Sequence, residues 1–99
     1  MKKTFELTHP KIKLARRVEA VKYEIKKYLK RERNKTLPAG VDFWDFDCKF
    51  GKTEAEAQPV HVSQINKLID QTQLENLTSF YVEILAKAGY RQTRLDDEE

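Results

Sequence analysis

Apolar residues recur at steps of three and four positions between Lys11 and Lys35. Such spacing places them on one side of an α-helix, so that a single apolar stripe faces a core. The sequence therefore predicts a long amphipathic helix over Lys11–Lys35, capped by Thr8 or His9 and with Pro10 in its first turn. A helix of this length measures about 35 Å, and we expect its C-terminal end to project from a small domain. The stripe consists of Leu14, Val18, Val21, Ile25 and Tyr28 or Leu29.

The clearest strand pattern lies at Val41–Phe50, where apolar and polar residues alternate. Successive side chains of a strand point to opposite faces of a sheet, so alternation assigns one set of residues to the core. We expect the other face to carry Phe43, Asp45, Asp47 and Lys49. The residues expected in the core are Trp44, Phe46, Cys48 and Phe50.

Three further segments have patterns typical of strands. Thr4–Thr8 alternates over a short stretch, and Ala57–Val62 contains a proline at position 59 that favours an edge of the sheet. The third, Ser79–Lys87, is predicted to be the last strand of the chain. Its residues expected in the core are Phe80, Val82, Ile84 and Ala86.

A second helix is predicted between the last two of these strands. Ser63 is expected to cap it, Gln64–Leu74 to form it and Asn76 to end it. The resulting order (β)αββαβ favours an α+β fold, a two-layer sandwich in which both helices cover one face of an antiparallel sheet. If the N-terminal strand forms, this is the split βαβ arrangement of the ferredoxin-like fold. We expect a single domain over residues 1–90 and a flexible acidic C-terminal tail over residues 91–99.

Charge is distributed unevenly along the chain. Residues 1–37 contain thirteen Lys/Arg and four Asp/Glu, whereas residues 38–99 contain six Lys/Arg and twelve Asp/Glu. A basic N-terminal part indicates a nucleic acid or an acidic protein as partner. No stretch approaches the ~18 consecutive apolar residues that a membrane-spanning helix needs. The single cysteine favours a reducing compartment, so we expect a cytoplasmic protein without a membrane partner.

Four stretches of the sequence are similar to those of a known family. Leu7–Lys13, Tyr28–Arg33, Val41–Gly51 and Phe80–Lys87 resemble a family of short uncharacterised proteobacterial proteins. The resemblance covers nearly the whole chain. It implies a bacterial, cytosolic origin and, because the family has no assigned activity, it implies no site residues.

The predicted first helix is the main candidate for a binding surface, because it carries eleven Lys/Arg and three Glu. A row of cations along a rigid rod can track phosphates and release counterions, which gives affinity with little sequence preference. The alternatives are a solvated helix face and a contact with an acidic protein. The candidate nucleic-acid-binding residues are Lys13, Arg17, Lys27, Lys30 and Arg31.

The sheet is a poorer candidate for RNA. Proteins of related architecture stack bases on aromatic residues of their central strands. In this chain Asp45 and Asp47 lie on the face expected to be open, where they would repel phosphate. Phe43, Tyr81 and Phe5 are the aromatic residues that could stack there. We therefore expect RNA to be bound by the helix.

Catalytic and metal-binding patterns are sparse. Asp45, Asp47 and His61 could meet on the exposed side of the sheet as a crude metal site, although a solvated polar face is the simpler interpretation. Cys48 is expected to be a small buried hydrophobic residue. We find no nucleophile–base pair, no metal-ligand spacing and no cofactor loop, and expect a non-enzymatic protein that needs no cofactor.

A second hypothesis uses the open face of the sheet. Phe43, Tyr81 and Leu85 would form an apolar trio there, suited to a homodimer or to another protein. The alternative is that these are scattered surface residues. The sequence thus leaves two candidate functions, polyanion binding by the helix and protein interaction by the sheet, and either a monomer or a weak homodimer.

Overall fold

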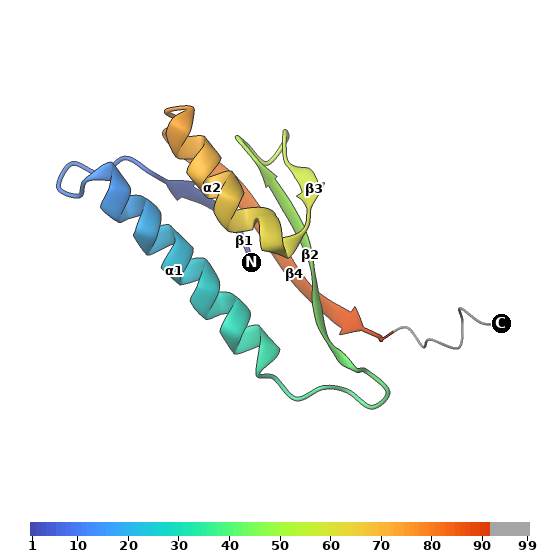
Figure 1. Ribbon diagram of the computed structural model, residues 1–99. Coiled ribbons are helices and arrows are strands. Elements are labelled where there is room, and N and C mark those ends of the chain that lie inside the picture. The colour runs from blue at the N-terminus through green and yellow to red at the C-terminus, as the bar shows by residue number, and fades with distance from the viewer. Residues whose placement is uncertain (92–99) are drawn as a thin grey trace.

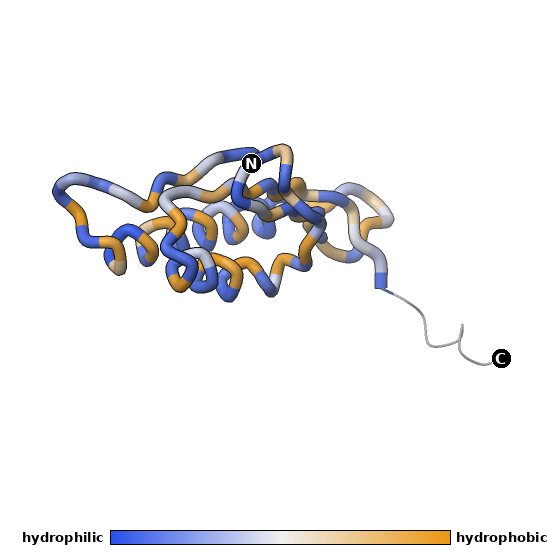
Figure 2. Tube along the Cα trace, turned by 90° about the horizontal axis from the view of Figure 1, so that it is seen from above, coloured by the Kyte–Doolittle hydropathy of each residue, from blue (hydrophilic) through white to orange (hydrophobic). Residues whose placement is uncertain are grey.

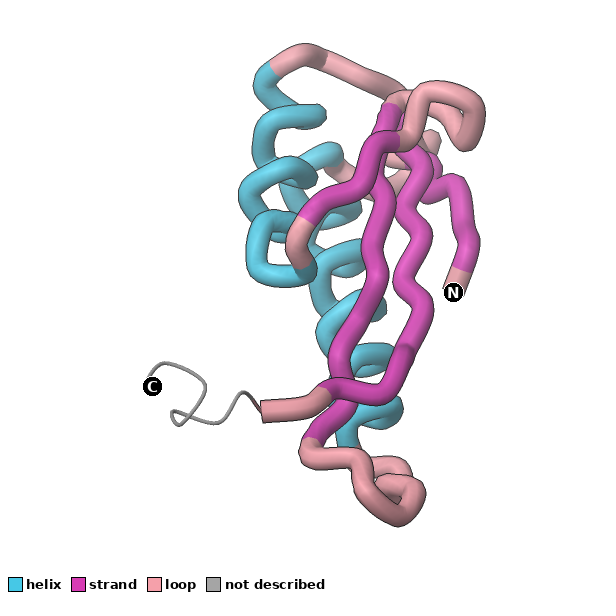
Figure 3. The backbone as a smooth tube through the Cα atoms, turned by 90° about the vertical axis from the view of Figure 1, so that its right-hand side faces the viewer, coloured by secondary structure: helices cyan, strands magenta, loops and turns pink. Residues whose placement is uncertain are grey.

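Four antiparallel strands and two α-helices make up the computed structural model, which describes residues 1–91 (Figure 1). Both helices lie on one face of the sheet and leave the other face without a second layer (Figure 3). The α+β architecture predicted from the sequence is confirmed. The strands are β1 Lys2–Glu6, β2 Phe43–Gly51, β3 Gln58–Val60 and β4 Ser79–Gly89, and the helices are α1 Leu14–Arg33 and α2 Ile65–Leu74.

The core fills the space between the helices and the sheet. Apolar residues recur along both helices, with apolar and polar positions coloured in Figure 2, and they alternate with polar residues along β2. The helical period and the strand period each place apolar side chains on one side of an element, and these sides face one another in the layer between helices and sheet. The fully or nearly fully buried apolar residues are Phe5, Leu7, Val18, Val21, Ile25, Phe46, Cys48, Phe50, Ile65, Ile69, Phe80, Val82 and Ile84.

The strand order differs from the ferredoxin-like expectation. The order across the sheet is β1-β4-β2-β3, so β4 lies between β1 and β2. In the ferredoxin-like arrangement that place belongs to the third strand. Here β3 is a three-residue edge strand that contains Pro59, which cannot donate a backbone hydrogen bond to a second neighbour. The central place goes to β4, the longest strand.

Helix α1 starts later than predicted. His9 and Pro10 form a turn, in which the backbone amide of Lys11 donates to Nδ1 of His9 at 3.0 Å. This turn satisfies the Lys11 amide outside the helix. Helix α1 then begins at Leu14, with Lys13 as its N-cap residue. The predicted capping role of Thr8 or His9 is therefore wrong. The predicted apolar stripe is confirmed from Val18 onward, where Val18, Val21 and Ile25 are buried and Tyr28 and Leu29 are partly buried. Leu14, at the first position of the helix, was predicted to belong to the stripe but is exposed.

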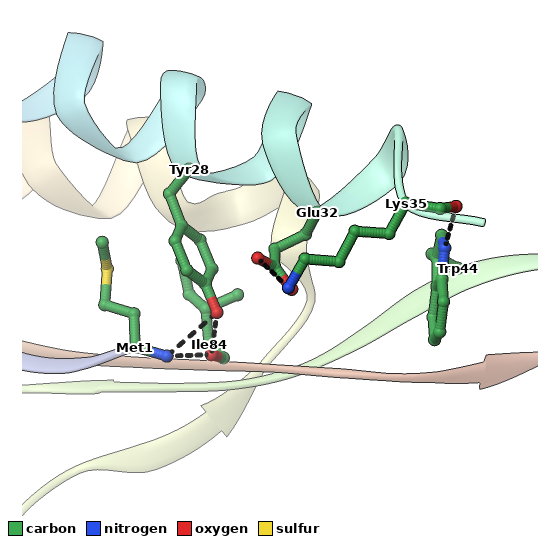
Figure 4. A network of polar contacts seen from close by, with 6 residues as sticks. All are labelled: Met1, Tyr28, Glu32, Lys35, Trp44 and Ile84. Carbon is green, nitrogen blue, oxygen red and sulfur yellow. Dashed lines mark hydrogen bonds and ion pairs between the residues drawn. The ribbon is translucent and has the colours of Figure 1, made fainter. Parts of the chain in front are cut away.

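The C-terminal end of α1 does not project. The indole Nε1–H of Trp44 on β2 donates to the backbone carbonyl of Lys35 at 2.9 Å (Figure 4). The guanidinium carbon of Arg33 lies 5.3 Å from the ring centre of Phe46 on the same strand. Because β2 and β4 extend beyond β1 and β3, they form a long two-stranded support along which this end of the helix lies.

Helix α2 has a different cap from the one predicted. Nδ1 of His61 accepts a hydrogen bond from the amide of Ser63 at 3.1 Å, and the side chain of Gln64 accepts one from the amide of His61 at 3.1 Å. This reciprocal pair is a capping box, and it starts a short 3-10 turn over Val62–Gln64 that leads into α2. Asn76 has φ of 58° just beyond the helix, which confirms the predicted stop.

Replacing His61 tests this capping arrangement. His61→Ala removes the acceptor for the Ser63 amide, and we expect it to lower the free energy of unfolding by about 1 kcal/mol. His61→Asn keeps an acceptor of suitable reach and should restore most of that loss. Urea denaturation followed by circular dichroism measures both variants. Equal unfolding midpoints for wild type and His61→Ala would show that the cap does not stabilise α2.

The core-facing residues of β2 and β4 are largely as predicted. Phe46, Cys48 and Phe50 are buried, and Trp44 is half-buried at the end of α1. Ala86 was also predicted to lie in the core but is exposed. Burial raises the pKa of the Cys48 thiol to about 11, which keeps it neutral. The predicted tail lies outside the described residues, except for Arg91.

Candidate nucleic-acid interface

The side of α1 opposite the core carries a group of basic residues near its C-terminal end. With 3.6 residues per turn, the buried positions Val21 and Ile25 place Tyr23 and Lys27 on the outward side. Lys30 and Arg31 follow one turn later and are exposed. We call Lys27, Lys30 and Arg31 the cationic cluster.

The cationic cluster borders a shallow hollow of about 510 Å³. Nζ of Lys27 lies 5.5 Å from the ring centre of Tyr23, and the guanidinium carbon of Arg31 lies 5.6 Å from that of Tyr28. Cations at this distance from an aromatic face are attracted to the π-electrons of the ring. Each tyrosine therefore helps to hold one cation at the surface of the helix. The hollow is lined by Tyr23, Lys27, Lys30, Arg31, Asn34 and Lys35.

The carboxylates nearest in sequence are engaged with other cations. Glu24 pairs with Lys3 of β1 at 2.6 Å, and Glu32 pairs with Lys35 at 2.9 Å. Within residues 1–91, no carboxylate lies within 4.0 Å of a nitrogen of the cationic cluster. The positive charge of the cluster is thus not compensated by an ion pair in the described part of the chain.

A partly buried polar contact fixes this part of α1 to the sheet (Figure 4). The backbone nitrogen of Met1 donates to the hydroxyl of Tyr28 at 3.1 Å and to the carbonyl of Ile84 at 2.7 Å. Burial and the nearby charge of Glu32 raise the pKa of Tyr28, so its hydroxyl stays protonated. Tyr28 also contacts Arg31. Its hydrogen bonds to Met1 and Ile84 therefore link the cationic cluster to the sheet.

The structure separates the five predicted site residues into two groups. Lys27, Lys30 and Arg31 come together, whereas Arg17 and Lys13 lie toward the other end of α1, about 15 Å and about 21 Å from Lys27 along the helix axis. Arg17 is turned toward β1, and its Nε–H donates to the backbone carbonyl of Glu6 at 2.7 Å. Arg17 therefore holds the chain between β1 and the helix, a role that the sequence pattern did not indicate.

The aromatic residues expected to stack bases are placed differently. Phe5 is 1% exposed and belongs to the core, and Tyr81 is 4% exposed, so neither ring is accessible. Phe43 is 39% exposed and packs across the strand pair over Gly89. The aromatic side chain that does lie open beside basic residues is Tyr23, at 61% exposure. Its position four residues before Lys27 was the available sequence signal.

The burial of Tyr81 has a local cause. Tyr81 pairs in register with Gly51, where the loop to β3 folds back so closely that a Cβ on Gly51 would lie 2.6 Å from Cα of Ala57. The hydroxyl of Tyr81 donates to Glu83 at 2.9 Å. Burial and this hydrogen bond raise the pKa of Tyr81 to about 12. This end of the open face is therefore covered by the chain itself.

The possible metal ligands on the open face have other partners. Asp47 forms an ion pair with Lys87 at 2.7 Å, and its hydrogen bond raises the pKa of the Lys87 ammonium. Asp45 accepts a hydrogen bond from the backbone amide of Phe46 at 2.8 Å. His61 is occupied by the capping box. Among residues 1–91 no three His, Cys, Asp or Glu are grouped so that they could hold a metal ion.

The predicted apolar trio is not one patch. In the register of β2 with β4, Phe43 lies across from Gly89, Leu85 across from Asp47, and Tyr81 across from Gly51. Charged pairs, Asp45 with Lys87 and Lys49 with Glu83, occupy the rows between them. Leu85 also shares its row with the charged Asp47, so the three apolar residues are separated by charged side chains, as scattered surface residues are.

These features define a small α+β protein with an open, four-stranded antiparallel sheet and a cationic cluster on its first helix. The chain belongs to a family of unknown function, DUF6172, whose family model matches residues 1–95. The family resemblance noted in the sequence is confirmed to that extent. Neither the curated proteins nor the solved structures contain a match to this chain. Over residues 1–91, we find no helix with the length and hydrophobicity that crossing a membrane requires.

Proposed function

We propose that this is a non-enzymatic protein that binds nucleic acid, RNA in particular, through the C-terminal half of α1. The observation that carries the proposal is the cationic cluster, in which Lys27, Lys30 and Arg31 share one exposed hollow. No carboxylate of residues 1–91 lies within ion-pair distance of these cations. Three such cations can neutralise phosphates and release condensed counterions.

The charges around the cluster support the same proposal. Residues 23–35 contain six Lys/Arg and two Glu, and both glutamates are paired with a lysine. The helix supplies a straight support about 30 Å long, so the cations keep their spacing. Lys13 and Arg17 remain proposed phosphate contacts at the far end of this support, and Arg17 also donates a hydrogen bond to the carbonyl of Glu6 on β1.

A structural explanation for these cations is also available, and it makes a different prediction. Lys30, Arg31 and Arg33 stand in the last turn of α1, where cations interact favourably with the helix dipole. That effect contributes about 0.3–1 kcal/mol per residue to stability and requires no ligand. It does not explain Lys27, which stands before the last turn, nor the exposed tyrosine beside it.

Protein interaction through the open sheet face is the weaker proposal. Its apolar residues are separated by charged pairs, and Tyr81 is buried. We therefore propose a monomer that meets its ligand through α1. A cytoplasmic location accords with RNA as ligand and with a single, buried cysteine.

The salt dependence of RNA binding by the full chain tests the proposed function. Each phosphate contact to a single strand contributes about −0.7 to the slope of log affinity against log salt concentration. Three contacts predict a slope of about −2, that is, a roughly 15- to 20-fold loss between about 50 and about 200 mM salt. Fluorescence anisotropy with a labelled RNA gives this slope. Affinity that stays constant up to about 0.5 M salt would contradict the proposal.

A further inference from the structure

Tyr23 is an unusually open aromatic residue in a basic surrounding. Its side chain is 61% exposed, although a large aromatic ring usually has most of its area covered. It borders two hollows, the one of about 510 Å³ described above and a second of about 430 Å³ on the other side of Lys27. Lys27 and Arg31 line both hollows. The ring thus stands beside two cations that can each hold a phosphate.

Resting on the nucleic-acid binding proposed above, we infer that the ligand is single-stranded RNA with one base stacked on Tyr23. The cationic cluster then holds the phosphates on either side of that base. Stacking on an aromatic ring is available to every base, so this arrangement binds single strands with little sequence preference. Asn34 lines the same hollow about 16 Å further along the helix, where its amide can contact another nucleotide of the strand.

The shape of the surface favours a single strand over a duplex. The ring lies on the outward side of α1, opposite the buried residues, where a base that is free of its neighbours can cover it. In a duplex the bases are stacked on each other and paired, and the A-form major groove is too narrow for side chains to read. A duplex would therefore contact only the cations, and would gain nothing from Tyr23.

Apart from its contact with Lys27, Tyr23 has no packing role in the described part of the chain. Its ring packs within reach of the Lys27 ammonium but contributes nothing to the core. If the ring served only to hold Lys27, its removal would weaken the binding of every anion by the same factor. If it stacks a base, its removal weakens only ligands with unpaired bases. This difference separates the two roles.

The test compares Tyr23→Ala, Tyr23→Phe and Tyr90→Ala in the full chain. Tyr90 is a matched control, because it is 62% exposed and lies after β4, on a different element from the cationic cluster. The probes are a labelled oligouridylate of about 12 nucleotides, an RNA duplex with the same number of phosphates, and inorganic polyphosphate. Anisotropy and competition give the affinity for each.

We expect Tyr23→Ala to weaken oligouridylate binding by about tenfold, the lower range of measured base–aromatic stacking. Its affinity for the duplex and for polyphosphate should stay unchanged, and its salt slope should equal that of wild type. Tyr23→Phe keeps the ring and should bind like wild type, as should Tyr90→Ala. Circular dichroism should show the same fold for all three variants, because both tyrosines are exposed.

Two results would overturn the inference. If Tyr23→Ala binds oligouridylate as well as wild type does, or loses affinity equally for all three probes, then no base stacks on Tyr23. In both cases the salt-dependent binding of wild type still supports the proposed function. If wild type binds none of the three probes, the proposed function fails together with the inference.

Discussion

The double substitution Lys27→Glu/Arg31→Glu is expected to weaken RNA binding by about 600-fold at about 0.1 M salt. Each lost phosphate contact accounts for roughly a fivefold loss at this salt concentration, and each new carboxylate repels phosphate by a similar factor. Lys30 remains, so the slope of log affinity against log salt should fall from about −2 to about −0.7. Anisotropy at several salt concentrations measures both quantities on the same sample.

A variant with the same change of net charge at other positions controls for the effect of overall charge on RNA binding. Lys52→Glu/Lys67→Glu alters two exposed lysines, one in the loop after β2 and one on α2. The loop after β2 lies at the opposite end of the sheet from the C-terminal end of α1 (Figure 1). We expect this control to lose less than tenfold. Equal losses in the two double variants would show that binding follows net charge and needs no cluster.

The same double variants separate binding from stability. Both residues of the cationic cluster that are changed are exposed, so the fold should persist. Reversal at Arg31 removes a favourable interaction with the helix dipole and should lower stability by no more than about 1 kcal/mol. A loss of RNA binding together with a nearly unchanged unfolding midpoint is the expected pattern. Unfolding of the variant would instead assign Lys27 and Arg31 to the stability of α1.

The elements of the fold were predictable because each has a regular apolar period. The spacing of Val18, Val21 and Ile25 identifies the buried side of α1, and alternation identifies the buried face of β2. Their order in the sheet was not predictable in the same way. Alternation shows which face of a strand is buried, but not which strands are its neighbours. The nearly continuous apolar run of Phe80–Ala86 was the one signal for a central strand.

The residue at which a helix starts depends on individual capping hydrogen bonds. A sequence pattern does not show which of several possible caps will form. Ser63 is a more common cap than His61, yet the imidazole of His61 accepts the bond from Ser63 and the side chain of Gln64 completes the box. At the other helix, His9 offers an equally local bond to the amide of Lys11, and the chain forms a turn there. Both the cap of α2 by His61 and the turn at His9 depend on the path of the chain before the helix.

The candidate site was predictable as far as it follows the helical period. Lys27, Lys30 and Arg31 lie within four residues of each other, so their common side follows from helix geometry. The hydrogen bond of Arg17 was not predictable from the sequence, because its partner, the carbonyl of Glu6, belongs to another element. Tyr81 was assigned wrongly because a loop that no strand pattern describes covers it. Tertiary contacts of this kind decide which charged and aromatic side chains remain accessible.

Phe80→Ala should cause the largest loss of stability, because this residue links three strands of the core. It is fully buried on β4, and its ring centre lies 4.9 Å from that of Phe50 on β2 and 5.6 Å from that of Phe5 on β1. Removing a buried phenyl ring costs its transfer free energy and leaves a cavity, together about 3–5 kcal/mol. Domains of this size are stable by only about 5–15 kcal/mol, so the variant should be partly unfolded at 37 °C.

Phe43→Ala is the matched control on the neighbouring strand. Phe43 is 39% exposed and packs over Gly89, so we expect its removal to cost about 1 kcal/mol. Urea denaturation compares the two variants, and Phe80→Leu, which keeps most of the buried volume, should give an intermediate value if Phe80→Ala does not fold. If Phe80→Leu were no less stable than Phe43→Ala, the packing of Phe5, Phe50 and Phe80 would not be the centre of the core. The cationic cluster depends on that centre, because β4 also supplies the carbonyl of Ile84 to which Tyr28 donates at 3.4 Å.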